Sequence, residues 1–128
     1  MIYDLVVIGA GAGGCFAAIR LGELKKGTRI LVLEAARKPL SKVEISGGGR
    51  CNVTHACYEP EELITYYPRG NPELLEPFRK FQPQDMVDWF ERKGIRLKTE
   101  PDGRIFPKTD ISATIIQCFL TAFKKLNI

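Results

Sequence analysis

The chain has 128 residues, of which 45% are hydrophobic and 27% charged, a balance that fits one ordinary soluble domain and excludes a disordered chain. Its formal net charge is +4, but the basic residues are spread along the whole length, which favours a solvated surface over a nucleic-acid track. No apolar run reaches the roughly 18 residues of a membrane span and no basic segment precedes the first one, so we expect a cytoplasmic protein without a membrane partner.

A strand, a crossover helix and a second strand are predicted over the first 34 residues. A strand is predicted over residues 2–8, because they contain the apolar run 5–8, rich in Val and Ile, which is typical of a strand buried on both faces of a parallel sheet. A helix is expected over residues 12–25, with Gly27 as a left-handed stop, and residues 29–34 repeat the strand pattern. Together they predict a right-handed parallel βαβ unit.

The turn after the first strand matches the pattern G-x-G-x-x-G at Gly9, Gly11 and Gly14. In dinucleotide-binding folds the first glycine permits a tight bend, the second lets the backbone approach a pyrophosphate, and the third lets the helix pack on the sheet. The N–H groups of Ala12, Gly13 and Gly14 would then face phosphate at a positive helix end.

Glu34 ends the second strand, 20 residues after Gly14, where an acid is expected to accept hydrogen bonds from ribose hydroxyls. Its charge repels a 2′-phosphate, which argues against NADP at this site. It does not separate NAD from FAD, because the adenosine halves are the same.

Residues 35–58 lose all periodicity and are expected to form a long functional loop. Residues 46–49 place three glycines in a row, so the backbone there can approach a flat or anionic ligand and offer several N–H donors. Arg50 could neutralise a pyrophosphate, and Asn52 could hydrogen-bond the edge of a heteroaromatic ring. The alternative is a flexible linker.

Short helices are predicted next, each with a proline at or near its first turn, over residues 60–67, 72–81 and 83–93. In the third of them Met86, Val87 and Phe90 share one face, and Gly94 ends it. Residues 95–99 and 104–106 predict an antiparallel hairpin around a turn at residues 101–103.

A last helix is expected to be capped near Asp110. Its apolar residues recur at helical spacing: Ile111, Ile115, Ile116, Phe119, Leu120 and Phe123. The chain stops directly after this helix, where an α/β protein would add a strand. We therefore expect the N-terminal part of a longer protein, with a βαβ unit and glycine-rich loop over residues 1–58 and a helical segment with a hairpin over 59–128.

The cysteines predict neither a metal site nor a disulfide framework. Cys15, Cys51, Cys57 and Cys118 form no C-x-x-C pair, and the single histidine, His55, lies outside zinc-site spacing. Reduced thiols are the favoured interpretation. A redox-active pair of Cys51 and Cys57 is disfavoured by its six-residue spacing.

These motifs resemble the bacterial FAD-dependent oxidoreductases of the aminoacetone-oxidase type, or BaiN-like flavoproteins, in the superfamily of glutathione reductase. The resemblance is carried by residues 7–14, Glu34, Lys42 with residues 45–54, and residues 103–107. It spans the whole chain but only the N-terminal part of that family. It implies an α/β fold, the N-terminal part of a Rossmann-like FAD/NAD(P)-binding domain with a mostly helical insertion and a small β-hairpin.

The resemblance also implies where FAD would bind. The pyrophosphate would lie on the first glycine turn and the adenosine ribose on Glu34, and the second cluster would line the half towards the flavin. The implied cofactor-binding residues are Gly9, Gly11, Ala12, Gly13, Gly14, Glu34, Lys42, Gly48, Gly49, Arg50, Cys51 and Asn52. No catalytic residue is implied.

His55 stands where the family pattern usually continues with Asn. A plain loop histidine is favoured over a proton carrier or a covalent flavin attachment point.

The expected function is hydride transfer through FAD on a small-molecule substrate, with NAD(P)H as a candidate electron donor. The isolated fragment is expected to be inactive and to bind FAD weakly. Three alternatives stay open: an NAD-binding dehydrogenase half, a non-catalytic dinucleotide-binding protein, and an RNA-modifying flavoprotein.

Overall fold

The computed structural model describes residues 2–128, which form two compact units. The first unit joins the chain up to Cys51 with the C-terminal segment Ile111–Ile128. The second unit is the intervening segment Asn52–Asp110. Each unit has its own sheet and its own helices.

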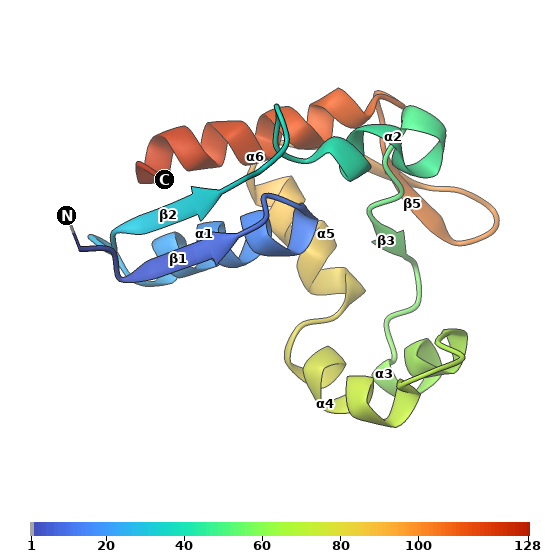
Figure 1. Cartoon of the computed structure of the whole chain (residues 1–128). Helices are drawn as coiled ribbons and strands as arrows, with labels where there is room; N and C mark the ends of the chain where they lie inside the picture. Colours follow the sequence, from blue (N-terminus) through green and yellow to red (C-terminus); the bar gives the residue numbers. More distant parts are fainter. Residues whose placement is uncertain (1) are drawn as a thin grey trace. The chain divides into compact units, whose positions relative to one another are not determined.

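The sheet of the first unit pairs β1 (Leu5–Ile8) with β2 (Ile30–Leu33) in parallel. Leu5 lies opposite Ile30 and Ile8 opposite Leu33, and α1 (Ala12–Leu24) connects the two strands and packs on both of them (Figure 1). The connection ends at Gly27, whose φ of +81° is left-handed. The predicted parallel strand-helix-strand unit is therefore confirmed.

Two expectations for these strands are wrong. The first strand begins at Leu5 rather than at residue 2, because the chain bends at Asp4, whose carboxylate accepts a 2.8 Å hydrogen bond from the N–H of Arg29. The strands are also not buried on both faces, since Ile8 is 87% exposed and Val6 48%. Helix α1 covers one face only, and no other described element covers the second.

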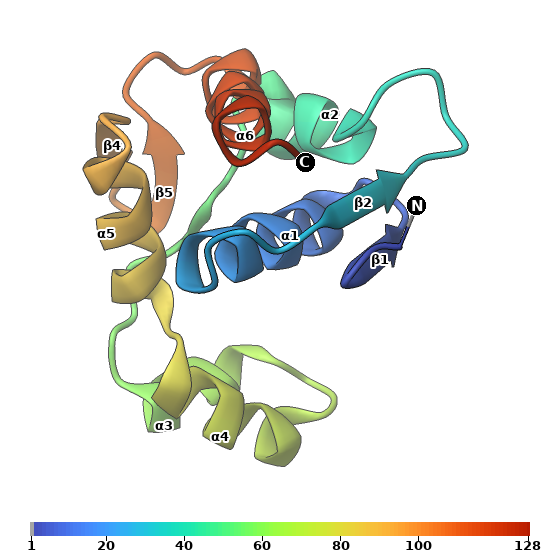
Figure 2. The same ribbon diagram turned by 90° about the vertical axis from the view of Figure 1, so that its left-hand side faces the viewer.

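The predicted loop between residues 35 and 58 contains a helix, α2 (Ser41–Gly49). The sequence did not indicate this helix because its last residues are glycines, which are typical of loops. Helix α6 (Ser112–Leu126) packs against both α1 and α2 (Figure 2). A Cβ built on Gly22 of α1 would lie 3.2 Å from Leu126 Cδ1, so these two helices cross closely. The hydroxyl of Ser112 donates to the carbonyl of Glu44 at 2.8 Å and joins α6 to α2.

The start of α6 differs from the prediction. Its N-cap is Ile111, which supplies no side-chain hydrogen bond, and Asp110 has a left-handed φ of +56° instead of capping the helix. The Asp110 carboxylate accepts a hydrogen bond from Lys98 Nζ. Asp110 therefore belongs to the hairpin that precedes the helix.

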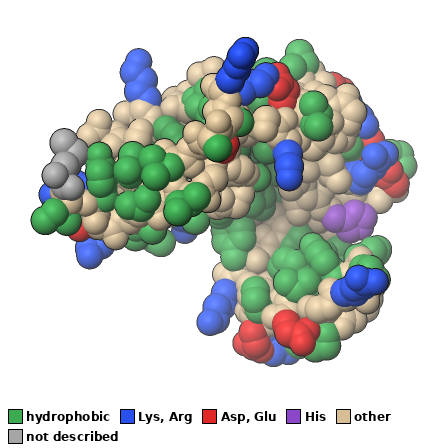
Figure 3. Space-filling view, in the orientation of Figure 1, with side chains coloured by type: hydrophobic (Ala, Val, Ile, Leu, Met, Phe, Trp, Pro, Cys, Tyr) green, Lys and Arg blue, Asp and Glu red, His purple; other side chains and the backbone are tan. Residues whose placement is uncertain are grey.

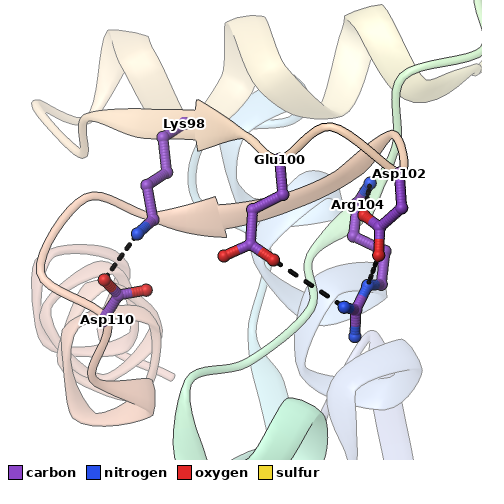
Figure 4. Close-up of polar contacts among 5 residues, drawn as sticks. All are labelled: Lys98, Glu100, Asp102, Arg104 and Asp110. Atoms are coloured by element: carbon purple, nitrogen blue, oxygen red, sulfur yellow. Dashed lines mark hydrogen bonds and ion pairs between the residues drawn. The ribbon is translucent and has the colours of Figure 1, made fainter.

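The sheet of the second unit has three antiparallel strands in the order β3 (Thr54–His55), β5 (Arg104–Pro107) and β4 (Leu97–Thr99). The predicted hairpin is confirmed, and Thr99 lies opposite Ile105. Figure 4 shows Arg104 between Asp102, at 2.7 Å, and Glu100, at 3.8 Å. These half-exposed ion pairs stabilise the turn only weakly.

The helices of the second unit follow the proline pattern. They are α3 (Pro60–Leu63) with the 3-10 turn η1 (Ile64–Tyr66), α4 (Asn71–Lys80) and α5 (Pro83–Arg92). Gln82 and Asp85 form a capping box at the start of α5. Trp89, which the predicted apolar face omitted, is only 2% exposed. Within residues 2–128, no helix combines the length and the apolar character needed to cross a membrane.

Candidate functional site

The turn between β1 and α1 is shaped by two of its glycines. Gly9 has a φ of +96°, and its N–H donates to the carbonyl of Leu33 at 2.7 Å, so the chain leaves the sheet by a sharp left-handed bend. A Cβ on Gly14 would lie 2.4 Å from the carbonyl oxygen of Gly9 and 2.9 Å from Val7 Cγ1. Helix α1 can therefore pack this closely on the turn only with glycine at position 14.

The other two glycines of the turn face open space. A Cβ on Gly11 or on Gly13 would meet nothing within 4 Å. Gly11 is the N-cap of α1 and supplies no side-chain hydrogen bond, and the first turn of the helix has no acidic residue. The N-terminal N–H groups of a 13-residue helix thus carry a positive partial charge beside an accessible backbone, which suits an anion such as phosphate.

Glu34 lies against this turn although it is 24 residues away from Ala10 in sequence. Its Oε2 accepts a 2.7 Å hydrogen bond from the N–H of Ala10, and its Oε1 accepts one of 2.7 Å from the N–H of Ala36. The Ala36 and Ala10 hydrogen bonds hold the pKa of Glu34 below its ordinary value. The carboxylate is therefore ionised at neutral pH, and each oxygen keeps a lone pair for a further donor such as a ribose hydroxyl.

Leu40 is a residue of the turn that sequence reasoning missed. It is 2% exposed, has a left-handed φ of +59°, and its N–H donates to the carbonyl of Ala10 at 2.8 Å. This contact folds residues 35–40 back onto the glycine turn and fixes where α2 begins. The available signal was the one large apolar side chain in residues 35–40, directly before Ser41.

The second glycine cluster is an ordered turn at the end of α2. Ser46 is extended, and Gly47, Gly48 and Gly49 then have φ values of +56°, +68° and +83°. Cys51 is also left-handed, and its N–H donates to the carbonyl of Ser46 at 3.0 Å. Arg50 between them is right-handed, with a φ of −98°, and this alternation of hand from Gly49 to Cys51 turns successive backbone N–H groups towards one side, as in anion-binding nests.

Cys15 and Cys51, the two cysteines nearest in sequence to the glycine clusters, do not provide a reactive thiolate here. Cys15 is 1% exposed, and burial, followed by the charge of Glu34, raises its pKa to about 11. Burial likewise raises the pKa of the Cys51 thiol. Both thiols stay protonated at neutral pH, so neither is activated as a nucleophile.

A comparison with known protein families tests the relationship that the motifs suggest. Residues 3–128 match the model of the HI0933-like protein Rossmann domain. The chain belongs to the HI0933-like family. This family lies in the superfamily of FAD-binding flavoproteins, so the α/β dinucleotide-binding fold predicted from the glycine pattern is confirmed.

Curated relatives of this HI0933-like chain are longer proteins. The ribosomal RNA dihydrouridine synthase of Escherichia coli (strain K12) is 30% identical over 126 residues, which cover 98% of this chain and 30% of that protein. The 3-dehydro-bile acid delta(4,6)-reductase of Clostridium scindens is 26% identical over 117 residues, covering 87% and 26%. The chain thus spans less than a third of the length of either relative.

The HI0933-like chain divides its predicted site residues between its two units. The glycine turn, Glu34, and the segment from Lys42 to Cys51 lie in the first unit, and Asn52 is the first residue of the second. The amide nitrogen of Asn52, oriented to suit its neighbours, donates to the carbonyls of Thr54 at 2.9 Å and Ile105 at 3.3 Å. These bonds tie Asn52 to the sheet and leave its Oδ1 as the remaining acceptor.

The charge of the HI0933-like chain is also divided. The first unit holds ten basic and four acidic residues, a net charge of +6, and the second unit holds nine basic and eleven acidic residues, a net charge of −2. The difference comes from the acidic residues, and only the unit that carries the glycine turn has a net positive charge. That distribution suits a dinucleotide, whose pyrophosphate is anionic.

Proposed function

We propose that this chain forms part of the FAD site of an oxidoreductase. The observation that carries the proposal is the pairing of an open glycine turn with a carboxylate bound directly to it, Glu34 Oε2 on the N–H of Ala10. The open positions beyond Gly11 and Gly13 fit a pyrophosphate, which needs a close backbone approach. Glu34 would accept hydrogen bonds from the adenosine ribose.

The second cluster would bind the half of the cofactor towards the flavin. The turn formed by residues 47–49 offers backbone N–H groups, and Lys42 and Arg50 supply positive charge on either side of it in sequence. An NAD-binding half has no need of this second cluster, so its ordered shape supports FAD over NAD. A bound flavin would supply the hydride chemistry, while the chain holds and orients it.

The names of the relatives indicate a class of substrate. Dihydrouridine differs from uridine by hydrogen added across one ring double bond, and a delta(4,6)-reductase acts on double bonds of a steroid ring system. In uracil and in a 3-oxo steroid of this kind, the double bond is conjugated with a ring carbonyl. We therefore infer that the whole protein reduces a ring C=C bond conjugated with a carbonyl, and that NAD(P)H is the ultimate electron donor.

Modification of RNA is the second candidate, because two relatives are ribosomal RNA dihydrouridine synthases, from Escherichia coli and from Haemophilus influenzae. The charge of the second unit, net −2, counts against a broad RNA surface there. A small cyclic substrate is therefore placed first.

The experiment is an anaerobic reduction assay with the full-length protein, FAD and NADPH or NADH. A steroid with a ring enone and a uridine-containing ribosomal RNA fragment are supplied in parallel, and products are identified by a mass increase of two hydrogens. The proposal expects saturation of the ring enone. Oxidation of the nicotinamide without reduction of either compound would contradict the inferred reaction.

A further inference from the structure

The second unit contains a pocket of about 350 Å³. Of the predicted cofactor-binding residues, only Asn52 lines it. The pocket volume lies within the range of about 300–1,000 Å³ that is typical of small-molecule sites. The pocket is lined by residues of β3 and of the helices α3, α4 and α5 together with the segments between them. Figure 3 shows the single histidine of the chain beside a cluster of hydrophobic side chains.

Aromatic side chains form much of the pocket wall. Tyr67 and Phe78 have ring centroids 5.5 Å apart and are tilted by 45°, and both line the pocket with Phe81. Leu63, which is 3% exposed, and Met86 add to the apolar lining. Such a surface favours a flat ring, which gains contact with aromatic faces and with an adaptable methionine.

His55 is one of the polar residues that line the pocket, and its neighbours hold it in place. A Cβ on Gly103 would lie 2.5 Å from His55 Cε1, so the imidazole lies directly on the hairpin turn in the space that only glycine leaves. The ring of Tyr66 lies 5.0 Å away, centroid to centroid. An imidazole fixed in this way can donate a hydrogen bond to a carbonyl oxygen of a ligand.

No residue that lines the pocket is Asp, Glu, Lys or Arg. A charged ligand would therefore lose its hydration in the pocket without gaining a partner of opposite charge. The excess of acidic residues in this unit adds to the cost for an anion. An uncharged ligand is favoured.

We propose that this pocket binds the uncharged ring of the substrate, a cyclic enone, with its faces against Tyr67, Phe78 and Phe81 and its carbonyl on His55. The choice of an enone rests on the proposed function, whereas the preference for an uncharged ring follows from the pocket itself. Under this proposal the histidine that replaces the usual Asn of the family pattern contributes to substrate recognition. Substrate binding would then be a role of the second unit, in which no catalytic residue is predicted.

The test is a titration of the ¹⁵N-labelled chain with androstenedione, an uncharged steroid that carries a ring enone, followed by amide chemical shifts. The proposal expects saturable shifts confined to the pocket, including those of Thr54, His55 and Met86. Tyr67→Ala removes one aromatic wall and should raise the dissociation constant about five- to tenfold.

Tyr58→Ala is the matched control, because Tyr58 is 41% exposed and Tyr67 39%, and only Tyr67 lines the pocket. This variant should bind androstenedione as the unaltered chain does. Equal weakening in both variants, shifts outside the pocket, or no saturable shift would overturn the proposal. Unchanged spectra away from position 67 show that the Tyr67→Ala chain is folded.

Uridine is titrated in a second arm. A uracil ring has an N–H group that could donate a hydrogen bond to Asn52 Oδ1, whereas androstenedione has no such donor. Binding of uridine without binding of androstenedione would overturn the enone and identify a nucleobase pocket instead. No flavin is present in these titrations. A failure to bind androstenedione would therefore not contradict FAD binding by the first unit. A failure to bind FAD would likewise not contradict the result of the titrations.

Discussion

At the scale of single residues, the glycine turn separates a structural role from a binding role. Gly14 is needed for packing, since any Cβ there would strike the Gly9 carbonyl oxygen, whereas Gly11 borders open space. Glu34 connects the two roles, because the carboxylate that accepts a hydrogen bond from Ala10 is also the group that we propose binds a ribose hydroxyl. A substitution at Gly14 should therefore lower the stability of the chain, whereas one at Gly11 should weaken binding.

Gly14→Ala should destabilise the chain by about 2 kcal/mol, because its methyl group would overlap a backbone atom that cannot move independently. Gly11→Ala should change the free energy of unfolding by less than about 0.5 kcal/mol while weakening dinucleotide binding. Urea unfolding of both variants measures the difference. Equal stability of the two variants would show that the close packing at Gly14 is not needed.

Glu34→Gln should remove a pH-dependent part of the stability. The folded-state pKa of Glu34 is depressed, so the stabilisation is complete above the ordinary value of 4.5 and is lost as the pH falls through the depressed value. The difference in unfolding free energy between the unaltered chain and Glu34→Gln should therefore be present at neutral pH and vanish in acid. Urea unfolding at several pH values measures it, and a difference independent of pH would contradict this role.

At the scale of elements, the sequence predicted those whose periodicity is uninterrupted. Helix α1, the proline-initiated helices and the hairpin around Gly103 all lie where expected. Helix α2 was missed because its apolar spacing is short and runs into Gly47–Gly49, which have the composition of a loop. The exposed face of β1 was missed for a different reason: an apolar run such as residues 5–8 indicates a strand but not which faces are covered.

The contact between α1 and α6 could not be predicted either, because it joins segments about 100 residues apart and depends on a small residue, Gly22, on an otherwise ordinary helix face. Among the candidate site residues, spacing predicted the glycine turn and Glu34, which the structure joins through the N–H of Ala10, and their role in binding stays a prediction. Leu40 was not predicted, because its role depends on a backbone N–H that bonds to Ala10. Any residue except proline can donate such a backbone hydrogen bond, so long-range backbone contacts are hardly detectable in the sequence.

Gly22→Ala should be close to neutral. The gain of about 1 kcal/mol in helix propensity offsets a 3.2 Å contact with the flexible end of Leu126. Gly22→Leu should instead destabilise the chain by about 2 kcal/mol or more, because it forces α6 away from α1. Thermal unfolding followed by circular dichroism distinguishes them, and a stable Gly22→Leu chain would argue against the close helix crossing.

At the scale of the whole molecule, the chain carries two kinds of site in two units of different charge. The first unit, at net +6, holds the glycine turn, and the second, at net −2, holds a pocket lined by no charged side chain. The evidence for a cofactor on the first unit is therefore independent of the evidence for an uncharged ring in the pocket, whereas the choice of an enone rests on the proposed function. The two units are connected in sequence at Cys51 and Asn52, where one passes into the other.

The most direct test of the central claim is the flavin content of the purified full-length protein. The account predicts a yellow protein that releases stoichiometric FAD on denaturation, identified by its mass, and a Gly11→Ala variant that is folded but largely colourless. A colourless unaltered protein that takes up NAD and never flavin would contradict it.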